Sequence, residues 1–406
     1  MSTIDVIKLI AHMFNPKIIQ DEIEEQYLED DDYRPWIVGF SGGKDSTMLL
    51  QLVWKALKAI PRELRKRDVY VICNNTLVEN PRILEYSESV LQKIEIAAVE
   101  QSLPVKVKRT TPKLEDTFWV NLLGLGYPAP NNSFRWCTER LKISPTSKFI
   151  KDAVSEFGEA IILLGTRKDE SSKRSASIKK HEISGQRLRK HMLSSAYVYA
   201  PIQDVKVTEL WQYLNQVPSP WKANNKELNS LYRNANGGDC PLVIDESTPS
   251  CGNSRFGCWV CTVVNKDKSM EALVENGEEW MRPLVDFRNL LADNRNNPDW
   301  RMHVRRNGQD GKGPYTFAIR AHLLKELLTA QKAVQSEDAS MRLINYQELV
   351  GIQVSWIRDN NFDFNVSEIY HEVYGTKIEI GDEQNSLLRE KKILEQSCEN
   401  KEDYKL

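Results

Sequence analysis

The sequence lacks the features of membrane and secreted proteins, and it has no strong charge of one sign. No apolar run in its 406 residues approaches the length of a membrane span, and residues 1–15 lack the charged head and continuous apolar stretch of a signal peptide. We therefore expect a cytoplasmic protein. The net charge is -2, so a nucleic-acid partner would have to meet local basic patches or be delivered by another subunit.

A Walker-type phosphate loop is also missing, but residues 37–46 read IVGFSGGKDS. Gly39 is followed by only three residues before Gly43-Lys44, and Asp45 stands where a Walker loop has Ser or Thr. Paired glycines between an apolar strand and an apolar helix still let backbone N–H groups approach an anion, and Lys44 adds a positive charge. Asp45 would repel phosphates unless a divalent cation lay between them, so the loop predicts a nucleotide with Mg²⁺. We expect Lys44 and Asp45 to lie on an exposed loop.

Strand-like and helical segments alternate after this point. The predicted strands are 36–40, 68–76, 104–110 and 159–167, and the predicted helices are 46–58, 82–102, 145–156 and 205–214. This alternation predicts an α/β fold, with a doubly wound parallel sheet and a smaller irregular or helical C-terminal region that contains cysteines. Ligands of such sheets lie at the carboxyl ends of the strands, so we expect the loops at 41–46, 74–80 and 165–174 to share one crevice.

Two charged segments are candidates for partner contacts. Residues 168–191 are polar and strongly basic, which is typical either of a solvated loop or of a nucleic-acid contact. We predict that the second interpretation holds and that DNA phosphates meet Lys179, Lys180, Arg187, Arg189 and Lys190. Residues 317–332 and 383–400 look helical, and the second of these is charged all round, as a docking element can be.

The expected compartment keeps thiols reduced. The seven cysteines are therefore predicted to be metal ligands or reactive thiols and not disulfides. Cys258 and Cys261 have the C-x-x-C spacing that lets two thiolates bind one metal, and Cys251 lies a short loop upstream. Cys137 or Cys240 could supply a further ligand. Thiolates favour zinc or an iron–sulfur cluster, and from spacing alone zinc is the commoner answer. Two other cysteines receive no such role: Cys73, inside a strand and expected to pack in the core, and Cys398.

The motif SGGKDS resembles the SGGxDS signature of the PP-loop ATP pyrophosphatases. These enzymes cleave ATP between its α- and β-phosphates, leave AMP on a substrate oxygen and release pyrophosphate. The resemblance implies a site for ATP and Mg²⁺ built from Ser41, Gly42, Gly43, Lys44, Asp45 and Ser46. Lys44, Asp45 and Ser46 would also take part in catalysis.

A second resemblance is to the PAPS and APS reductases, a branch of the same superfamily. LLGTRKDESSKR (163–174) is similar to their G-x-R-x-x-E-S-x-x-R element, which implies nucleotide contacts from Gly165, Arg167, Glu170, Ser171 and Arg174, with the two arginines counted as catalytic. RWCTERLKISP resembles a cluster-binding segment of APS reductases, although Trp136-Cys137 replaces a cysteine pair. The Glu-Cys-Gly-Leu-His element that carries the catalytic thiol of those reductases is absent, which argues against sulfite formation.

Taken together, SGGKDS, NNTLVENP, GTRKDES and SRFGCWVCTVV resemble the DndC family of DNA phosphorothioation sulfurtransferases. The resemblance implies a [4Fe–4S] cluster held by Cys137, Cys251, Cys258 and Cys261. It also implies DNA, DndD- and DndE-type subunits and a cysteine desulfurase as partners. Two alternatives stay open at this point: an enzyme of the same type acting on tRNA or a sulfonucleotide, and a nucleotide-binding scaffold subunit without turnover.

These patterns predict four regions along the chain. They are an N-terminal helical segment (1–34), a PP-loop domain (35–215), an iron–sulfur and substrate region (216–382) and a charged helical tail (383–406).

Overall fold

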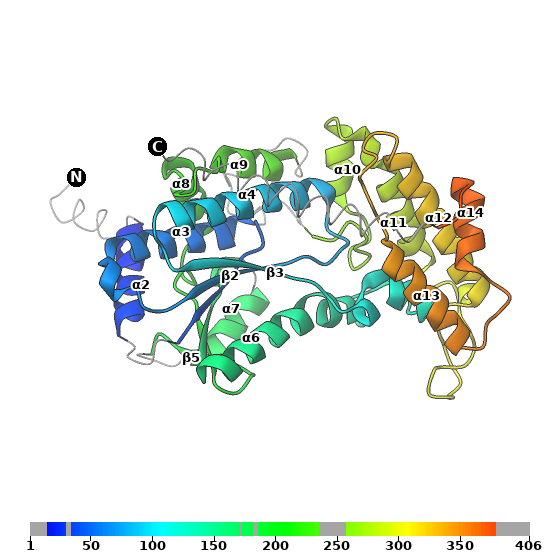
Figure 1. Ribbon diagram of the computed structural model, residues 1–406, viewed down its shortest axis with the longest axis horizontal. Helices are drawn as coiled ribbons and strands as arrows, with labels where there is room; N and C mark the ends of the chain where they lie inside the picture. Colours follow the sequence, from blue (N-terminus) through cyan, green and yellow to red (C-terminus); the bar gives the residue numbers. More distant parts are fainter. Residues whose placement is uncertain (1–13, 30–33, 171, 182–185, 235–256, 379–406) are drawn as a thin grey trace, which may run out of the picture. The chain divides into compact units, whose positions relative to one another are not determined.

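The computed structural model describes residues 14–29, 34–170, 172–181, 186–234 and 257–378 (Figure 1). Six strands form one sheet in the order β3-β2-β1-β4-β6-β5, and every neighbouring pair is parallel except β5 with β6. The strands are β1 (Trp36–Gly39), β2 (Val69–Asn74), β3 (Val105–Thr110), β4 (Ala160–Leu163), β5 (Arg189–Lys190) and β6 (Ala196–Tyr199). The predicted doubly wound parallel sheet is confirmed.

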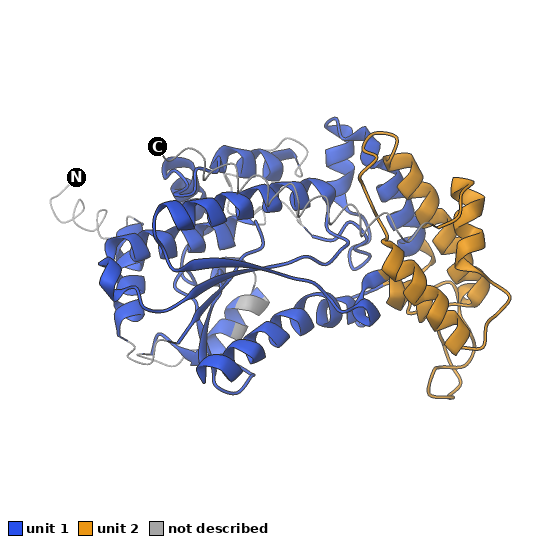
Figure 2. Cartoon of the chain, viewed as in Figure 1, with its two compact units in different colours: residues 1–118, 130–292 blue, residues 119–129, 293–406 orange. Residues whose placement is uncertain are grey.

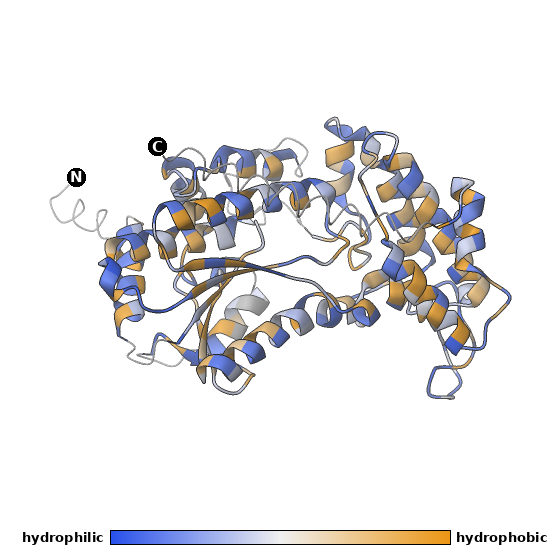
Figure 3. Ribbon diagram, in the orientation of Figure 1, coloured by the Kyte–Doolittle hydropathy of each residue, from blue (hydrophilic) through white to orange (hydrophobic). Residues whose placement is uncertain are grey.

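Alternation along each strand divides the core into two layers. Trp36 and Val38 of β1 pack into one buried cluster, whereas Ile37 between them packs into another. The first cluster is covered by α2 (Pro16–Leu28), α3 (Lys44–Ala59), α4 (Pro81–Glu100), α8 (Val207–Gln216) and α9 (Asn225–Asn234). On the other face lies α6 (Ser144–Phe157), which contributes Ile150 and Ala153. In Figure 3 the strands are largely apolar and the helices carry one apolar side, as this layering requires.

The chain reverses its direction across the sheet at β1. From β1 it runs through β2 to β3 at one edge, and then returns through α6 to β4 on the other side of β1. In open α/β sheets, ligands lie at such a reversal, outside the carboxyl ends of the strands. The predicted phosphate loop leaves β1 at this point.

Several elements between β4 and residue 294 were not predicted. Residues 168–191, for which neither a helix nor a strand was predicted, contain a 3-10 turn (Lys168–Glu170), α7 (Ser172–His181) and β5. The C-terminal region, expected to be irregular or helical, contains α9, α10 (Lys268–Glu275), a 3-10 turn (Glu279–Met281) and α11 (Arg282–Asn294). α7, α9 and α10 have only eight to ten residues, which is shorter than the stretch over which a helical period can be recognised in a sequence.

The chain forms two compact units (Figure 2). The first contains residues 1–118 and 130–292, and the second contains residues 119–129 and 293–406. The predicted boundaries at 34, 215 and 382 follow changes of sequence pattern rather than contacts, and they stay predictions. The remaining short elements of the first unit are 3-10 turns at Arg62–Leu64 and Leu114–Asp116, α5 (Trp136–Thr138) and a π-helical turn at Glu139–Ile143.

The second unit is helical. It contains a π-helical turn (Val120–Gly124), a 3-10 turn (Pro298–Trp300), α12 (Phe317–Val334), α13 (Tyr346–Arg358) and α14 (Val366–Tyr374). The helix predicted at 317–332 is confirmed by α12, whereas the tail helix predicted at 383–400 lies outside the described residues. The indole of Trp119 donates to Leu343 O at 2.6 Å, and that of Trp356 donates to Leu123 O at 2.8 Å. The segment 119–129 is thus part of the core of this unit.

Within the described ranges, no helix is both long enough and apolar enough to cross a membrane.

Candidate active site

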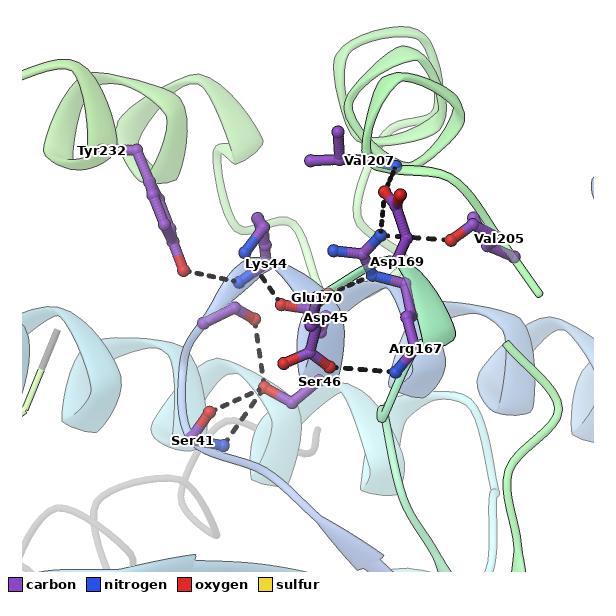
Figure 4. Close-up of polar contacts among 11 residues, drawn as sticks. Ser41, Lys44, Asp45, Ser46, Arg167, Asp169, Glu170, Val205, Val207 and Tyr232 are labelled. Carbon is purple, nitrogen blue, oxygen red and sulfur yellow. Dashed lines mark hydrogen bonds and ion pairs between the residues drawn. The ribbon is translucent and has the colours of Figure 1, made fainter. Parts of the chain in front are cut away.

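The predicted phosphate loop leaves β1 and leads directly into α3 (Figure 4). Gly42 has a φ of +70°, and a side chain there would collide with Ser87 on α4, so both the backbone and the space require glycine. The hydroxyl of Ser46 closes the turn, because it donates to Gly43 O at 3.0 Å and accepts from Ser41 N at 3.2 Å. The serines and glycines of SGGKDS therefore form one small turn at the start of a helix.

We expected Lys44 and Asp45 to lie on an exposed loop. This expectation was wrong, because they are the first two residues of α3. Lys44 is only 8% exposed, and its Nζ lies 3.0 Å from Asp45 Oδ2. The other oxygen, Asp45 Oδ1, accepts from Arg167 Nε at 2.5 Å. Burial by itself raises the pKa of Asp45, but Lys44 and Arg167 outweigh it, and the pKa lies below its ordinary value. The three residues form a buried network of charges.

Arg167 comes from the loop after β4, as predicted, and it is 1% exposed. Besides Asp45 it contacts Val205 O at 3.1 Å and Asp169 Oδ2 at 3.3 Å, while its backbone N–H donates to Glu170 Oε1 at 2.9 Å. Gly165 lies so close to Asp45 that a Cβ there would be 3.0 Å from the Asp45 backbone. The loops at 41–46 and 165–170 are therefore in direct contact.

Arg167 therefore positions the carboxylate of Asp45, which in turn pairs with Lys44. The two remaining residues of the predicted element are less informative. Ser171 lies outside the described residues, and Arg174 lies in α7 with a side chain that is not described. Each oxygen of Asp45 already contacts a cation, so a Mg²⁺ ion bound here would share this carboxylate with Lys44 and Arg167.

A cavity of about 300 Å³ lies beside the loop at the carboxyl ends of the central strands. Its lining includes Ser41 after β1, the β2 residues Cys73 and Asn74 with Glu79 beyond them, and Leu164 after β4. The loops at 41–46 and 74–80 both line this crevice, as expected, but no described residue of the third expected loop, 165–174, lines it. Burial raises the pKa of Cys73 to about 12, so this thiol stays protonated at neutral pH.

A second cavity, of about 530 Å³, contains the thiols. Cys137, Cys258 and Cys261 all line it, although Cys137 lies more than a hundred residues upstream of the other two. Cys251 and the rival ligand Cys240 lie outside the described residues, as does Cys398. Within the described ranges, no group of three or more His, Cys, Asp or Glu side chains is arranged to hold a metal ion. The structure brings three of the four predicted ligands to one cavity, but it does not arrange these three described residues as a metal site.

Contacts with the loop after β2 fix the C-x-x-C segment. Glu79 and Cys258 form an antiparallel bridge, and Trp259 N donates to Val78 O at 3.0 Å. The hydroxyl of Thr76 contacts Glu79 Oε1 at 2.9 Å and Cys258 Sγ at 3.4 Å. The same loop therefore lines the cavity beside the phosphate loop and supports the thiols.

The thiol chemistry fits a soft metal centre. Burial, and after it Glu79, raise the pKa of Cys258 to about 12, and burial together with Cys261 raises the pKa of Cys137. Without a metal these two groups are protonated thiols at neutral pH, and a bound metal would displace their protons. Thiolates are ligands that zinc and iron–sulfur clusters prefer, and three cysteines line this cavity.

Residues 35–264, more than half of the chain, match the phosphoadenosine phosphosulfate reductase domain. The chain belongs to this reductase family. A curated relative is the uncharacterized protein MJ0066 of Methanocaldococcus jannaschii, which is 27% identical over 263 residues. The match covers 63% of this chain but only 43% of that protein, so the chain spans less than half the length of this relative.

Solved structures similar to this reductase-family chain include three enzymes. The PAPS reductase of Candida auris, in a phosphate complex, is 11% identical, and the match covers 54% of this chain and 93% of that one with a TM-score of 0.30. The NH3-dependent NAD synthetase of Campylobacter jejuni is 15% identical, with coverages of 70% and 93% and a TM-score of 0.31. The U34-tRNA thiolase NcsA of Methanococcus maripaludis, with its [4Fe-4S] cluster, is 14% identical, with coverages of 69% and 77% and a TM-score of 0.29.

Lys142 is a site residue of the reductase-family domain that was not predicted from the sequence. Of the described residues it alone lines both cavities. Cys258 first, and then Glu79, raise its pKa against the opposing effect of burial. The π-helical turn Glu139–Ile143 widens the helix here and directs both Cys137 and Lys142 to the cavity. The sequence signal was present, since Lys142 lies five residues after Cys137, but a lone lysine in a basic segment does not stand out.

Proposed function

We propose that this chain is an ATP pyrophosphatase and sulfurtransferase that replaces a non-bridging oxygen of a DNA phosphodiester by sulfur. The observation that carries the proposal is the position of Lys142, because this side chain lines both the cavity beside the phosphate loop and the thiol cavity. An adenylylated acceptor bound by the phosphate loop would then lie next to the source of sulfur. Membership of the reductase family supports ATP-dependent or sulfonucleotide chemistry at this edge of the sheet.

Adenylation solves the main difficulty of the reaction. A phosphodiester is a poor electrophile, because its negative charge repels sulfide and its oxygen is a poor leaving group. In the first step a non-bridging oxygen of DNA attacks the α-phosphorus of ATP, and the bond to pyrophosphate breaks. Backbone N–H groups of Gly42 and Gly43 and the hydroxyls of Ser41 and Ser46 would bind the pyrophosphate, and Lys44 would neutralise its growing charge.

In the second step a sulfide equivalent attacks the DNA phosphorus, and AMP leaves with the original oxygen. Lys142 would lower the repulsion between the two anions, since this residue lines both cavities. The sulfur would come from a cysteine desulfurase as a persulfide, which a thiol reductant would reduce by two electrons to the sulfide that attacks phosphorus. DndD- and DndE-type subunits would help to present the DNA. A [4Fe–4S] cluster held by Cys137, Cys251, Cys258 and Cys261 would supply iron atoms that bind sulfide.

The products of ATP cleavage test the first step. Anaerobically purified protein is mixed with ATP, with or without DNA, and the nucleotides are separated by chromatography. We expect AMP and pyrophosphate, formed faster with DNA, and no AMP from the Lys44→Ala variant. ADP and phosphate would overturn the pyrophosphatase assignment, whereas stimulation by tRNA or a sulfonucleotide but not by DNA would overturn the acceptor.

Sulfur incorporation tests the second step. After addition of cysteine, a desulfurase and the partner subunits, the DNA is digested with nuclease and examined by mass spectrometry. We expect phosphorothioate-linked dinucleotides, which resist the nuclease. Their absence, with AMP formation intact, would separate the ATPase from the proposed transfer of sulfur.

A further inference from the structure

A tyrosine far from the phosphate loop in sequence contacts it directly. Tyr232 lies on α9, and its hydroxyl is 3.4 Å from the backbone nitrogen of Lys44 (Figure 4). Its ring centroid is 5.2 Å from Lys44 Nζ. The Tyr232 side chain thus contacts both the backbone amide and the ammonium group of Lys44.

The position of Tyr232 is fixed by the surrounding helices. Asn225, at the start of α9, accepts from Gln51 of α3 at 3.0 Å and donates to Leu214 O and Val217 O at the end of α8. The Tyr232 ring packs edge-on against Trp211, with 5.2 Å between the centroids. Tyr232 is only 6% exposed. The contact with Lys44 is therefore part of the folded core.

The hydroxyl lies where a phosphate oxygen would be expected. Lys44 N is the first amide of α3, and the preceding residue, Gly43, has no side chain to cap it. Free amides at a helix start, next to a lysine, are the groups that bind anions. A Cβ on Gly43 would lie 3.3 Å from the Tyr232 hydroxyl, which explains a glycine at a position whose φ of -79° any residue could adopt.

We propose that Tyr232 is a positioning residue with two opposing effects on ATP. Its ring holds the Lys44 ammonium beside Asp45, ready for the leaving pyrophosphate. Its hydroxyl occupies the Lys44 amide in the free protein and is displaced by a phosphate oxygen of ATP. This inference rests on the proposed function, because it assigns the phosphate loop to the pyrophosphate part of ATP.

The two effects are separated by two substitutions. Tyr232→Phe keeps the ring and removes the competing hydroxyl, so we expect pyrophosphate to bind about two- to tenfold more tightly and the KM for ATP to fall, with kcat nearly unchanged. Tyr232→Leu removes the ring, so the ammonium is no longer held, and we expect kcat to fall about tenfold.

A second lysine–tyrosine pair in the same unit provides the control. Lys55 Nζ lies 5.4 Å from the ring centroid of Tyr213, and neither residue lines the cavity beside the loop. The buried hydroxyl of Tyr213 has no hydrogen-bond partner among the described residues. Tyr213→Phe should therefore change neither pyrophosphate affinity nor the kinetics of ATP cleavage.

The experiment measures pyrophosphate binding by calorimetry, AMP formation at varied ATP and thermal melting, for the wild type and the three variants. Tighter binding by Tyr232→Phe, together with reduced kcat in Tyr232→Leu, supports the proposal. Weaker binding by Tyr232→Phe would overturn it, because the hydroxyl would then bind phosphate instead of competing with it. Equal losses of melting temperature in both variants, with unchanged kcat and affinity, would also overturn it and leave a structural role. If the wild type formed no AMP, the proposed function would fail, but the pyrophosphate affinities would still test Tyr232.

Discussion

The phosphate loop and the thiol cavity lie at the same edge of one sheet, but they are built differently. The loop is six consecutive residues closed by short-range hydrogen bonds, and its Asp45 is held by ion pairs with Lys44 and Arg167. The thiol cavity is assembled from Phe118 and the segments 130–142 and 257–268, with support from the loop after β2. A contiguous site is specified by local sequence, whereas an assembled site depends on the fold and on what fills it. Substitutions in the two sites can test this difference.

The largest effect should come from the thiols, because a metal centre is lost as a whole. Protein purified without oxygen should be brown and should contain about four iron atoms and about four acid-labile sulfides per chain. Serine at Cys137, Cys251, Cys258 or Cys261 should bleach it completely, as measured by visible absorption and metal analysis. Cys73→Ser is the matched control, since Cys73 lines the other cavity and should leave the colour intact.

Two results would contradict the assembled iron–sulfur site. Colourless protein with stoichiometric zinc would refute the cluster, although not the ligands. Bleaching by Cys240→Ser, with full colour in Cys251→Ser, would move the fourth ligand.

The next largest effect concerns the buried charges of the phosphate loop. Asp45→Asn leaves Lys44 and Arg167 without their shared counter-charge, so we expect AMP formation to stop and the free energy of unfolding to fall by about 3–5 kcal/mol. Urea denaturation measures this loss. In the double variant Asp45→Asn/Arg167→Gln the loss should be smaller than the sum of the two single losses, because one buried cation is gone.

The same carboxylate predicts a pH dependence. Because its folded pKa is below the ordinary value of 3.8, the stabilisation by Asp45 is complete above that value. It is lost as the pH falls through the lower folded pKa. The Asp45→Asn variant should lack this acid-dependent contribution, and identical acid titrations of the two proteins would contradict the assigned ion pairs.

Lys142 should have an intermediate effect, because it lies between the two sites and belongs to neither alone. Lys142→Gln should leave ATP binding within about threefold, but slow the transfer of sulfur by about 100-fold. Product analysis by mass spectrometry measures the transfer. The control is Lys148→Gln, which removes an exposed lysine that pairs with Asp152 on α6. Equal losses in ATP binding and in sulfur transfer would assign Lys142 to the phosphate site only.

The smallest effect is expected on α7. Arg187 of the basic segment already pairs with Glu25 and Glu29 on α2, but Lys179 and Lys180 are exposed. Replacing both lysines by Gln should reduce the slope of log K against log salt for DNA by about two, with intact AMP formation. The exposed, paired lysines Lys17 and Lys325 provide the control double variant. An unchanged slope would place the DNA contact elsewhere or on a partner.

The sequence predicted those parts of the fold and site that depend on neighbouring residues. The strands β1 to β4 carry strong apolar patterns, and the SGGKDS turn needs its glycines and serines within six positions. Lys142 and Tyr232 could not be predicted in the same way, because their roles depend on partners more than a hundred residues away. The exposure of Lys44 and Asp45 was wrong for the same reason, since the burying contacts come from α9 and from the loop after β4.

The segment 119–129 has a practical consequence for any attempt to divide this protein. The chain leaves the first unit after Phe118, returns at Pro130 and leaves again after Ala292, so the two units are interleaved in sequence. The reductase-family match ends at residue 264, which suggests an obvious place to cut the gene. A fragment ending there would keep Trp119, Leu122 and Leu123, all fully buried in the whole chain, but would lack α12 to α14 that cover them. Such a fragment would expose an apolar loop shortly before Cys137, and we expect it to aggregate. Only the uncut chain is expected to keep this loop buried.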